Sequence, residues 1–89
     1  MINGKTIVIT GANSGIGLET LKLLAKGDNK ILAVDLRTDR IDALGLSNVF
    51  AMVCDVSTKE NVDSIFAAAT EKLGSIDIFY ANAGFPYYE

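Results

Sequence analysis

The stretch that decides the fold is VITGANSGIG, residues 8–17. An apolar, β-branched run ends at Thr10, and three of the chain's eight glycines follow at positions 11, 15 and 17. A helix-like sequence begins at Ile16. Glycine allows a sharp turn and lets an anion approach the backbone amides with no Cβ in the way. Because the free N–H groups and the dipole of a helix N-terminus favour an anion, the turn predicts a phosphate-binding site.

The turn contains no basic residue, and the first one after it is Lys22. Phosphate would therefore be held by backbone amides, with help from Ser14. A P-loop would need lysine followed by serine or threonine after its last glycine, whereas Leu18 and Glu19 follow Gly17. Triphosphate chemistry on a mononucleotide is therefore not expected.

Strand-like and helix-like segments alternate along the whole chain. The apolar, β-branched segments that predict strands are residues 5–10, 30–35, 49–54 and 76–81. Helices are expected between them, over residues 15–27, 38–45 and 57–74, the second of them short. Such alternation implies parallel strands joined by right-handed crossovers. We therefore predict an α/β fold in one domain over residues 1–89, the Rossmann-type doubly wound sheet up to its fourth strand.

The spacing of apolar residues predicts which helix faces are buried. The first helix places four residues at helical spacing before a stop at Gly27, namely Ile16, Thr20, Leu23 and Leu24. The expected apolar face of the third helix comprises Val62, Ile65, Phe66, Ala69 and Leu73. Ser57 and Glu60 form a capping-box pattern before that face, and Gly74 takes the C′ position after it.

An acidic residue ends the second predicted strand. Asp35 follows Gly17 by eighteen residues, which is where a dinucleotide-binding fold places the acid that pairs with ribose hydroxyls. A carboxylate there repels a 2′-phosphate, which favours NAD over NADP. Arg37, two residues further on, could instead pair with such a phosphate. Asp35 would also suit the ribose of S-adenosylmethionine in a methyltransferase-type fold.

Composition excludes several other classes of function. The 89 residues have a net charge of −3, so no basic surface is expected for nucleic acid or an anionic membrane. Neither a signal peptide nor a bilayer-spanning segment is recognisable. The single cysteine excludes a disulfide framework, and the absence of histidine excludes the usual zinc sites. A cytoplasmic protein without a metal site is expected.

The pattern around these residues resembles that of the short-chain dehydrogenase/reductase family. Residues 10–17 match the family's TGxxxGxG motif. Asp55-Val56 follows the third predicted strand, and Asn82-Ala83-Gly84 follows the fourth. The family usually has Asn-Asn-Ala-Gly at the latter position, where this chain has Ala81 in place of the first asparagine. Three motifs in the family's order extend the resemblance over the whole chain.

The resemblance implies a role in cofactor binding for each matching residue. Asn13 would brace the turn, Asp35 and Leu36 would lie at the adenosine ribose, and Asp55 would accept a hydrogen bond from the adenine amino group. The backbone of Val56 would meet the adenine ring. The pyrophosphate would be lined by Gly11, Ser14, Gly15, Ile16 and Gly17, and the nicotinamide-side ribose by Asn82, Ala83 and Gly84.

In the resembling family, hydride transfer needs a tyrosine with a lysine four residues later, together with a serine. Tyr80 is followed at that distance by Gly84, and Tyr87 and Tyr88 have no fourth residue after them. No catalytic residue is therefore assigned, and the chain alone is expected to be inactive.

We interpret residues 1–89 as the cofactor-binding half of a longer oxidoreductase, a homo-oligomer that interconverts a small alcohol and a carbonyl. The alternative is a non-catalytic dinucleotide-binding module for redox sensing or interaction. An apolar fourth strand with an unpaired far edge agrees with the first interpretation.

Overall fold

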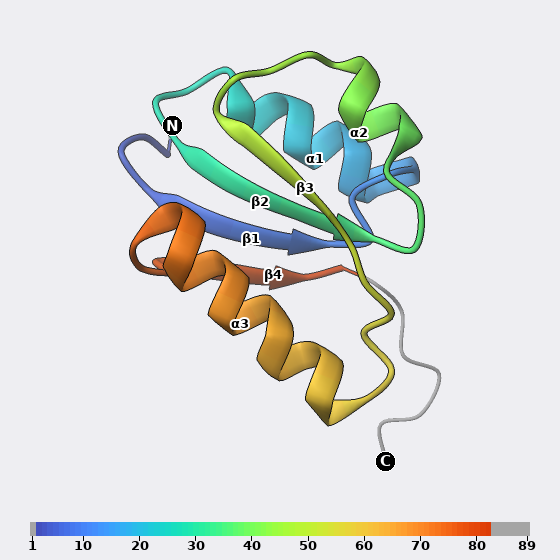
Figure 1. The fold of residues 1–89 in the computed structure, drawn as a ribbon. Coiled ribbons are helices and arrows are strands. Elements are labelled where there is room, and N and C mark those ends of the chain that lie inside the picture. Colours follow the sequence, from blue (N-terminus) through green and yellow to red (C-terminus); the bar gives the residue numbers. More distant parts are fainter. Residues whose placement is uncertain (1, 83–89) are drawn as a thin grey trace.

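A computed structural model describes residues 2–82 of the chain. Within this range four strands form one sheet: β1 (Thr6–Thr10), β2 (Lys30–Asp35), β3 (Val49–Val53) and β4 (Ile78–Ala81). The helices that connect them are α1 (Gly15–Ala25), α2 (Asp39–Ala43) and α3 (Lys59–Leu73). The spatial order is β3-β2-β1-β4, and each neighbouring pair is parallel (Figure 1). The predicted α/β, Rossmann-type sheet is confirmed.

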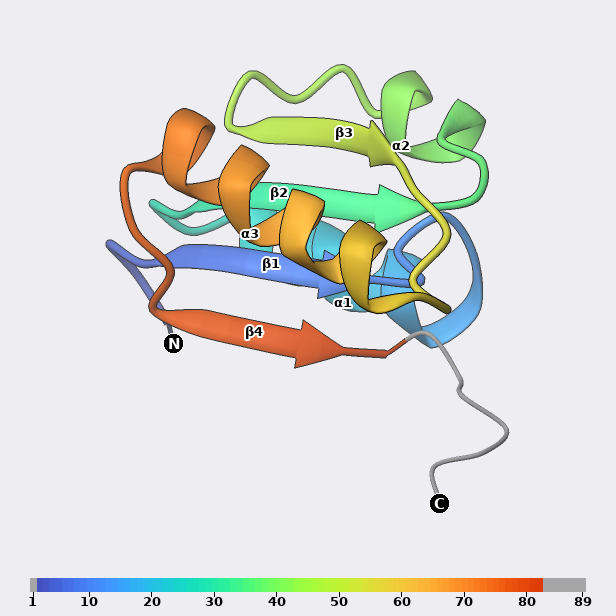
Figure 2. The ribbon, with the colours of Figure 1, turned by 60° about the horizontal axis from the view of Figure 1, so that its bottom comes forward.

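The helices cover both faces of the sheet. Figure 2 views the sheet from the side of α3, with β3 at one edge and β4 at the other, while α1 and α2 lie on the opposite face. Ile7, Ile9 and Ile31 pack under α1 and α2, whereas Val8 and Leu32 pack under α3. These five side chains have no exposed surface. Burial on both faces explains why β1 and β2 are continuous apolar runs.

The strand register brings the ends of all four strands to the same edge. Thr10 is paired with Val34 of β2 and with Ala81 of β4, and Asp35 is paired with Val53 of β3. The glycine turn, the acid of β2 and the segment after β4 therefore emerge side by side. We call this edge the carboxyl edge.

The predicted face of α1 is only partly correct: Leu24 packs against the core and Thr20 is half-buried, but the other two residues are not buried. Ile16 is 72% exposed and Leu23 is 56% exposed, whereas Gly17, Leu18 and Leu21 are buried. The cause is the close packing of Gly17 against the glycine turn that precedes the helix. This contact turns residues 17, 18 and 21 toward the sheet and Ile16 toward solvent.

The start of α3 also differs from the prediction by one residue. The N-cap is Thr58, whose side chain accepts a hydrogen bond from the Asn61 amide at 3.2 Å. Ser57 instead donates its own amide to Asp55 Oδ1 at 2.9 Å, which closes a turn before the helix. The chain enters α3 only after that turn, so Ser57 cannot cap it.

The predicted apolar face of α3 is largely correct. Ile65, Ala69 and Leu73 are buried against the sheet, and Gly74 ends the helix with a φ of 88°. Phe66 is 44% exposed, and its ring stacks on Phe79 of β4 with a centroid distance of 5.1 Å. No helix within residues 2–82 has the length and apolar character needed to cross a membrane.

Candidate functional site

The glycine turn connects β1 to α1 with almost no intervening chain. Gly11 and Gly15 have φ angles of 68° and 56°, in the left-handed region that glycine adopts without strain. The Ala12 amide donates to the Val34 carbonyl at 3.2 Å, which fixes the turn to β2. Ser14 is the N-cap of α1 in an extended conformation, and its side chain makes no capping hydrogen bond. The first turn of α1 thus points its backbone amides toward the carboxyl edge.

Gly17 marks the closest approach of α1 to its own turn. A Cβ at this position would overlap the Gly11 carbonyl and would lie 2.6 Å from Asn82 Nδ2. The Asn82 side chain donates to the same Gly11 oxygen at 3.1 Å. The segment after β4 therefore holds the glycine turn in place, and only glycine fits at position 17.

Asp35 connects the end of β2 to the glycine turn. Its Oδ2 accepts a hydrogen bond from the Asn13 amide at 2.9 Å, and its Oδ1 accepts one from the Leu36 amide at 2.7 Å. The carboxylate is thereby held at one wall of a hollow of about 320 Å³. The residues that line this hollow are Asn13, Ser14, Asp35, Leu36, Arg37, Asp39 and Arg40.

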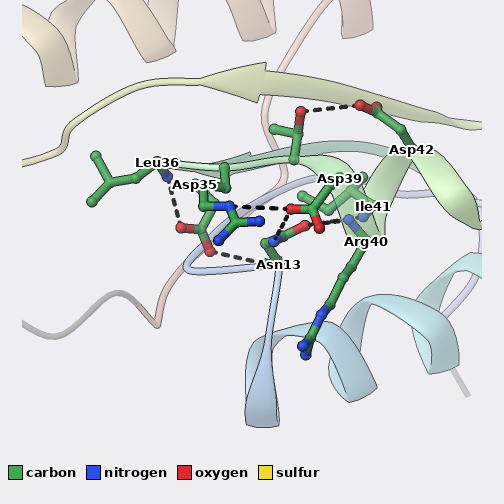
Figure 3. A network of polar contacts seen from close by, with 9 residues as sticks. Asn13, Asp35, Leu36, Asp39, Arg40, Ile41 and Asp42 are labelled. Atoms are coloured by element: carbon green, nitrogen blue, oxygen red, sulfur yellow. Dashed lines mark hydrogen bonds and ion pairs between the residues drawn. The ribbon is translucent and has the colours of Figure 1, made fainter.

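Asn13 joins the glycine turn to α2 as well as to β2 (Figure 3). Its side chain is 8% exposed, and its Nδ2 donates to Asp39 Oδ1 at 3.0 Å. Its Oδ1 accepts hydrogen bonds from the amides of Arg40 and Ile41, at 2.8 and 3.1 Å. Every polar atom of this side chain is therefore occupied, and Asn13 supports the wall of the hollow.

The hollow carries charges of both signs. Arg37 Nε lies 3.5 Å from Asp39 Oδ1, and both side chains are mostly exposed. The hydrogen bond from Asn13 lowers the pKa of Asp39, and the positive charges of Arg37 and Arg40 lower it further, while burial opposes them. Asp39 is therefore a carboxylate at neutral pH. The Arg40 side chain extends away from the contacts around Asn13 (Figure 3).

The segment after β3 lies at the same edge but outside the lining of the hollow. Asp55 is exposed, and its Oδ1 is bound to the Ser57 amide. Val56 is half-buried against the core under α3. Burial raises the pKa of the neighbouring Cys54 thiol, and the charge of Asp55 raises it further. The structure thus places Asp55 and Val56 near the site without bringing them into the hollow.

Two of the residues expected to bind cofactor, Ala83 and Gly84, lie outside the described residues. The sequence reasoning missed Asp39 and Arg40 as residues of the site. No motif marks them, because their place in the hollow depends on how α2 packs against Asn13. An acid following the strand-end acid by four positions is the only local signal for Asp39.

A glycine turn between β1 and α1, with an acid at the end of β2, defines a Rossmann-type nucleotide-binding fold. A family model described as short chain dehydrogenase matches residues 5–88. The chain therefore belongs to the short-chain dehydrogenase family, whose members are NAD(P)-binding oxidoreductases.

Individual relatives agree with this membership. The chain is 34% identical to farnesol dehydrogenase of Aedes aegypti, over 91% of this chain and 36% of that protein. It is 38% identical to short chain aldehyde dehydrogenase 1 of Euphorbia lathyris, over 93% of this chain and 31% of that protein. The chain thus spans about a third of the length of the curated relatives it matches.

A solved structure shows the same relation. The 3-ketoacyl-(acyl-carrier-protein) reductase from Brucella melitensis, crystallised with NADH, superimposes with a TM-score of 0.82 at 34% identity. The match covers 89% of this chain and 34% of the reductase.

Proposed function

We propose that this chain binds NAD as the cofactor-binding segment of an oxidoreductase that interconverts an alcohol and a carbonyl. When bound, the nicotinamide supplies the hydride acceptor or donor for that reaction. The family and its NAD(P)-binding fold support the proposal, as does the NADH in the Brucella reductase. The substrate is a small alcohol or carbonyl compound of a class that these residues leave open.

The observation that carries the proposal is the position of Asp35. Its carboxylate lies on the wall of the hollow, held there by the amides of Asn13 and Leu36. The same hollow reaches Ser14 at the start of α1, so an acid and the head of a helix face one space. An adenosine ribose next to a pyrophosphate requires that pairing of acceptor and amide donors.

In this proposal, different residues of the chain bind different parts of the cofactor. The carboxylate of Asp35 accepts hydrogen bonds from the ribose hydroxyls, and Leu36 borders the same sugar. Asp55 and Val56 meet the adenine. The amides and side chains around the pyrophosphate belong to Gly11, Ser14, Gly15, Ile16 and Gly17, and Asn13 braces the turn. By resemblance, Asn82, Ala83 and Gly84 lie at the nicotinamide-side ribose.

Asp35 also supports a preference for NAD over NADP. Two unit charges about 4 Å apart near a surface repel by up to about 4 kcal/mol, and salt lowers that figure. A quarter to a half of it gives a preference of about five- to thirtyfold.

The test is a calorimetric titration of the full chain with NAD, NADP and S-adenosylmethionine. We expect NAD to bind more tightly than NADP by about fivefold or more. Binding of neither dinucleotide, tighter binding of S-adenosylmethionine than of NAD, or NADP affinity at least equal to that of NAD would each contradict the proposal. Binding is the right readout, because residues 1–89 contain no tyrosine with a lysine four positions later.

The family resemblance also leads us to propose a homo-oligomer in the cytoplasm. Sedimentation equilibrium tests the assembly directly: a mass that is a multiple of the 9.5 kDa chain is expected. A single species at that mass over a wide range of concentrations would contradict it.

A further inference from the structure

We propose that Asp39 determines the specificity of the site for the cofactor, because its carboxylate holds the one side chain best placed to bind a 2′-phosphate, that of Arg37. The inference rests on the proposed function and extends it to a residue outside the glycine turn and the strand-end acid. Its basis is the group of contacts around the hollow in Figure 3.

The first step concerns the position of Arg37. It lines the hollow together with Asp35 and follows that acid by two residues. A guanidinium beside the adenosine ribose is the usual partner of a 2′-phosphate, since it offers several N–H donors to phosphate oxygens. In this structure Arg37 Nε lies 3.5 Å from Asp39 Oδ1. Arg37 therefore already has an anionic partner within the site.

The second step concerns what holds Asp39. The same Oδ1 atom accepts the hydrogen bond from Asn13 Nδ2 at 3.0 Å, and Asn13 is itself fixed by the amides of Arg40 and Ile41. Asp39 is thus anchored by a nearly buried side chain of the glycine turn. Within residues 2–82, no comparable hydrogen bond holds the Arg37 side chain, which is 79% exposed. Asp39 therefore positions the guanidinium of Arg37, whereas Arg37 does not position Asp39.

The third step is the effect on the two cofactors. Asp39 adds a second negative charge to the wall that already contains Asp35, and both repel a 2′-phosphate. Asp39 also competes with that phosphate for Arg37. NAD has an uncharged 2′-hydroxyl and is indifferent to both effects. Asp39 therefore lowers the affinity for NADP and leaves that for NAD nearly unchanged.

The substitution Asp39→Asn separates charge from shape. Asparagine keeps an oxygen that can accept from Asn13, but it loses the charge that attracts Arg37. Loss of the exposed ion pair frees Arg37 for the phosphate, and loss of one repulsive charge adds to this effect, so NADP affinity should rise about fivefold or more. NAD affinity should change less than about twofold.

Asp42→Asn is the matched control. Asp42 is exposed on the same helix, its Oδ2 accepts from Thr38 Oγ1 at 3.1 Å, and it does not line the hollow. The charge change is identical, yet NADP affinity should change less than about twofold. A double variant, Arg37→Gln with Asp39→Asn, should lose the part of the gain that comes from the released guanidinium and keep the part that comes from the lost repulsion.

Three results of these titrations at low ionic strength would overturn the inference. They are equal gains in Asp39→Asn and Asp42→Asn, no gain in Asp39→Asn, and a gain that persists in full without Arg37. In each of these the unsubstituted chain still binds NAD, so the proposed function stands. If the unsubstituted chain binds neither dinucleotide, the proposed function itself has failed, and the inference fails with it.

Discussion

Helices α1 and α3 both begin at the carboxyl edge of the sheet, and their first residues are used differently. Each helix follows a hydroxyl residue in an extended conformation, Ser14 with a φ of −157° and Thr58 with a φ of −121°. The Thr58 side chain accepts a hydrogen bond from the Asn61 amide. The Ser14 side chain makes no such bond. The side chain of Thr58 thus binds an amide at the N-terminus of α3. The side chain of Ser14 leaves the amides at the N-terminus of α1 available for another partner.

An acid lies beside each of the two helix N-termini, and these two acids differ in the same sense. Asp55 accepts from the Ser57 amide, only two residues along the chain. Asp35 accepts from the Asn13 amide, which is 22 residues away, and lines the hollow. The first bond shapes a local turn, and the second assembles a site from two strands. The difference shows that a helix N-terminus and a nearby acid define a site only when the chain's own side chains leave them available.

The most severe test of this comparison is Gly17→Ala. The new Cβ would overlap the backbone carbonyl of Gly11, so the turn at the head of α1 must shift. We expect the affinity for NAD to fall by about a hundredfold, equivalent to about 2.7 kcal/mol. Titration calorimetry measures this loss, and circular dichroism checks that the fold persists.

Gly27→Ala is the matched control for that substitution. A Cβ there would also be crowded, by Asn3 and by the Ile2 carbonyl, but at the opposite edge of the sheet. Stability should fall while NAD affinity of the folded protein stays within about threefold. If Gly27→Ala lowers NAD affinity as much as Gly17→Ala, general destabilisation explains both results, and the head of α1 has no special role.

A smaller effect is expected from replacing the acids that lie beside the two helix N-termini. Asp35→Asn removes the charge that faces the ribose, and we expect NAD affinity to fall about tenfold and NADP affinity to rise about fivefold, because the repulsion of the 2′-phosphate is lost. Asp55→Asn should lower NAD affinity only about two- to threefold, because asparagine can still accept from the adenine amino group. Equal losses in the two variants would remove the distinction between the local turn and the site.

The sequence predicted the sheet well because its signals are local. The segment KILAVD matches β2 at both of its bounds, and continuous apolar runs marked β1 and β2 as strands buried on both faces. The glycine spacing and the strand-end acid placed Gly17 and Asp35 at one edge, since parallel strands share their carboxyl ends. These features depend only on residue type and short spacings.

The errors arose where tertiary contacts override the local pattern. Periodicity alone placed Ile16 and Leu23 on the buried face of α1, but the packing of Gly17 against Gly11 rotates that face away from them. The Asp55 turn displaces the start of α3 from Ser57 to Thr58. The bonds from Asn13 to α2 join residues 26 to 28 positions apart, and no motif encodes them.

Substitution of the two N-cap residues should have smaller effects, one mainly on stability and the other mainly on NAD affinity. Thr58→Ala removes the hydrogen bond to the Asn61 amide and should lower the free energy of unfolding by about 1 kcal/mol, with NAD affinity unchanged. Ser14→Ala should change stability by less than about 0.5 kcal/mol but lower NAD affinity about threefold, because Ser14 lines the hollow. Urea unfolding and calorimetry measure the two quantities. A stability loss in Ser14→Ala as large as that in Thr58→Ala would mean that both helices are capped alike.

The smallest effect is expected at Asp77, an acid whose hydrogen bonds, like that of Thr58, stabilise the fold and do not contribute to the site. Asp77 Oδ2 accepts hydrogen bonds from the Thr6 amide at 2.9 Å and from Thr6 Oγ1 at 3.1 Å. The bond from the Thr6 amide lowers the pKa of Asp77 below its usual value of 3.8, helped by the Thr6 hydroxyl and Lys5 and opposed by burial. Since the folded state favours the carboxylate, its stabilising effect is present above that value and is lost as the pH falls through the lower, folded pKa.

Asp77→Asn should therefore flatten the decrease of the urea midpoint between about pH 5 and pH 3, relative to the unsubstituted chain. Glu71→Gln, the same charge change at an exposed position on α3, should leave the slope as it is. NAD affinity at neutral pH should be the same in both variants, because Asp77 precedes β4 at the edge opposite the hollow. If the urea midpoint of Asp77→Asn falls as steeply with pH as that of the unsubstituted chain, the hydrogen bonds from Thr6 do not favour the carboxylate. The charge of Asp77 then does not stabilise the fold.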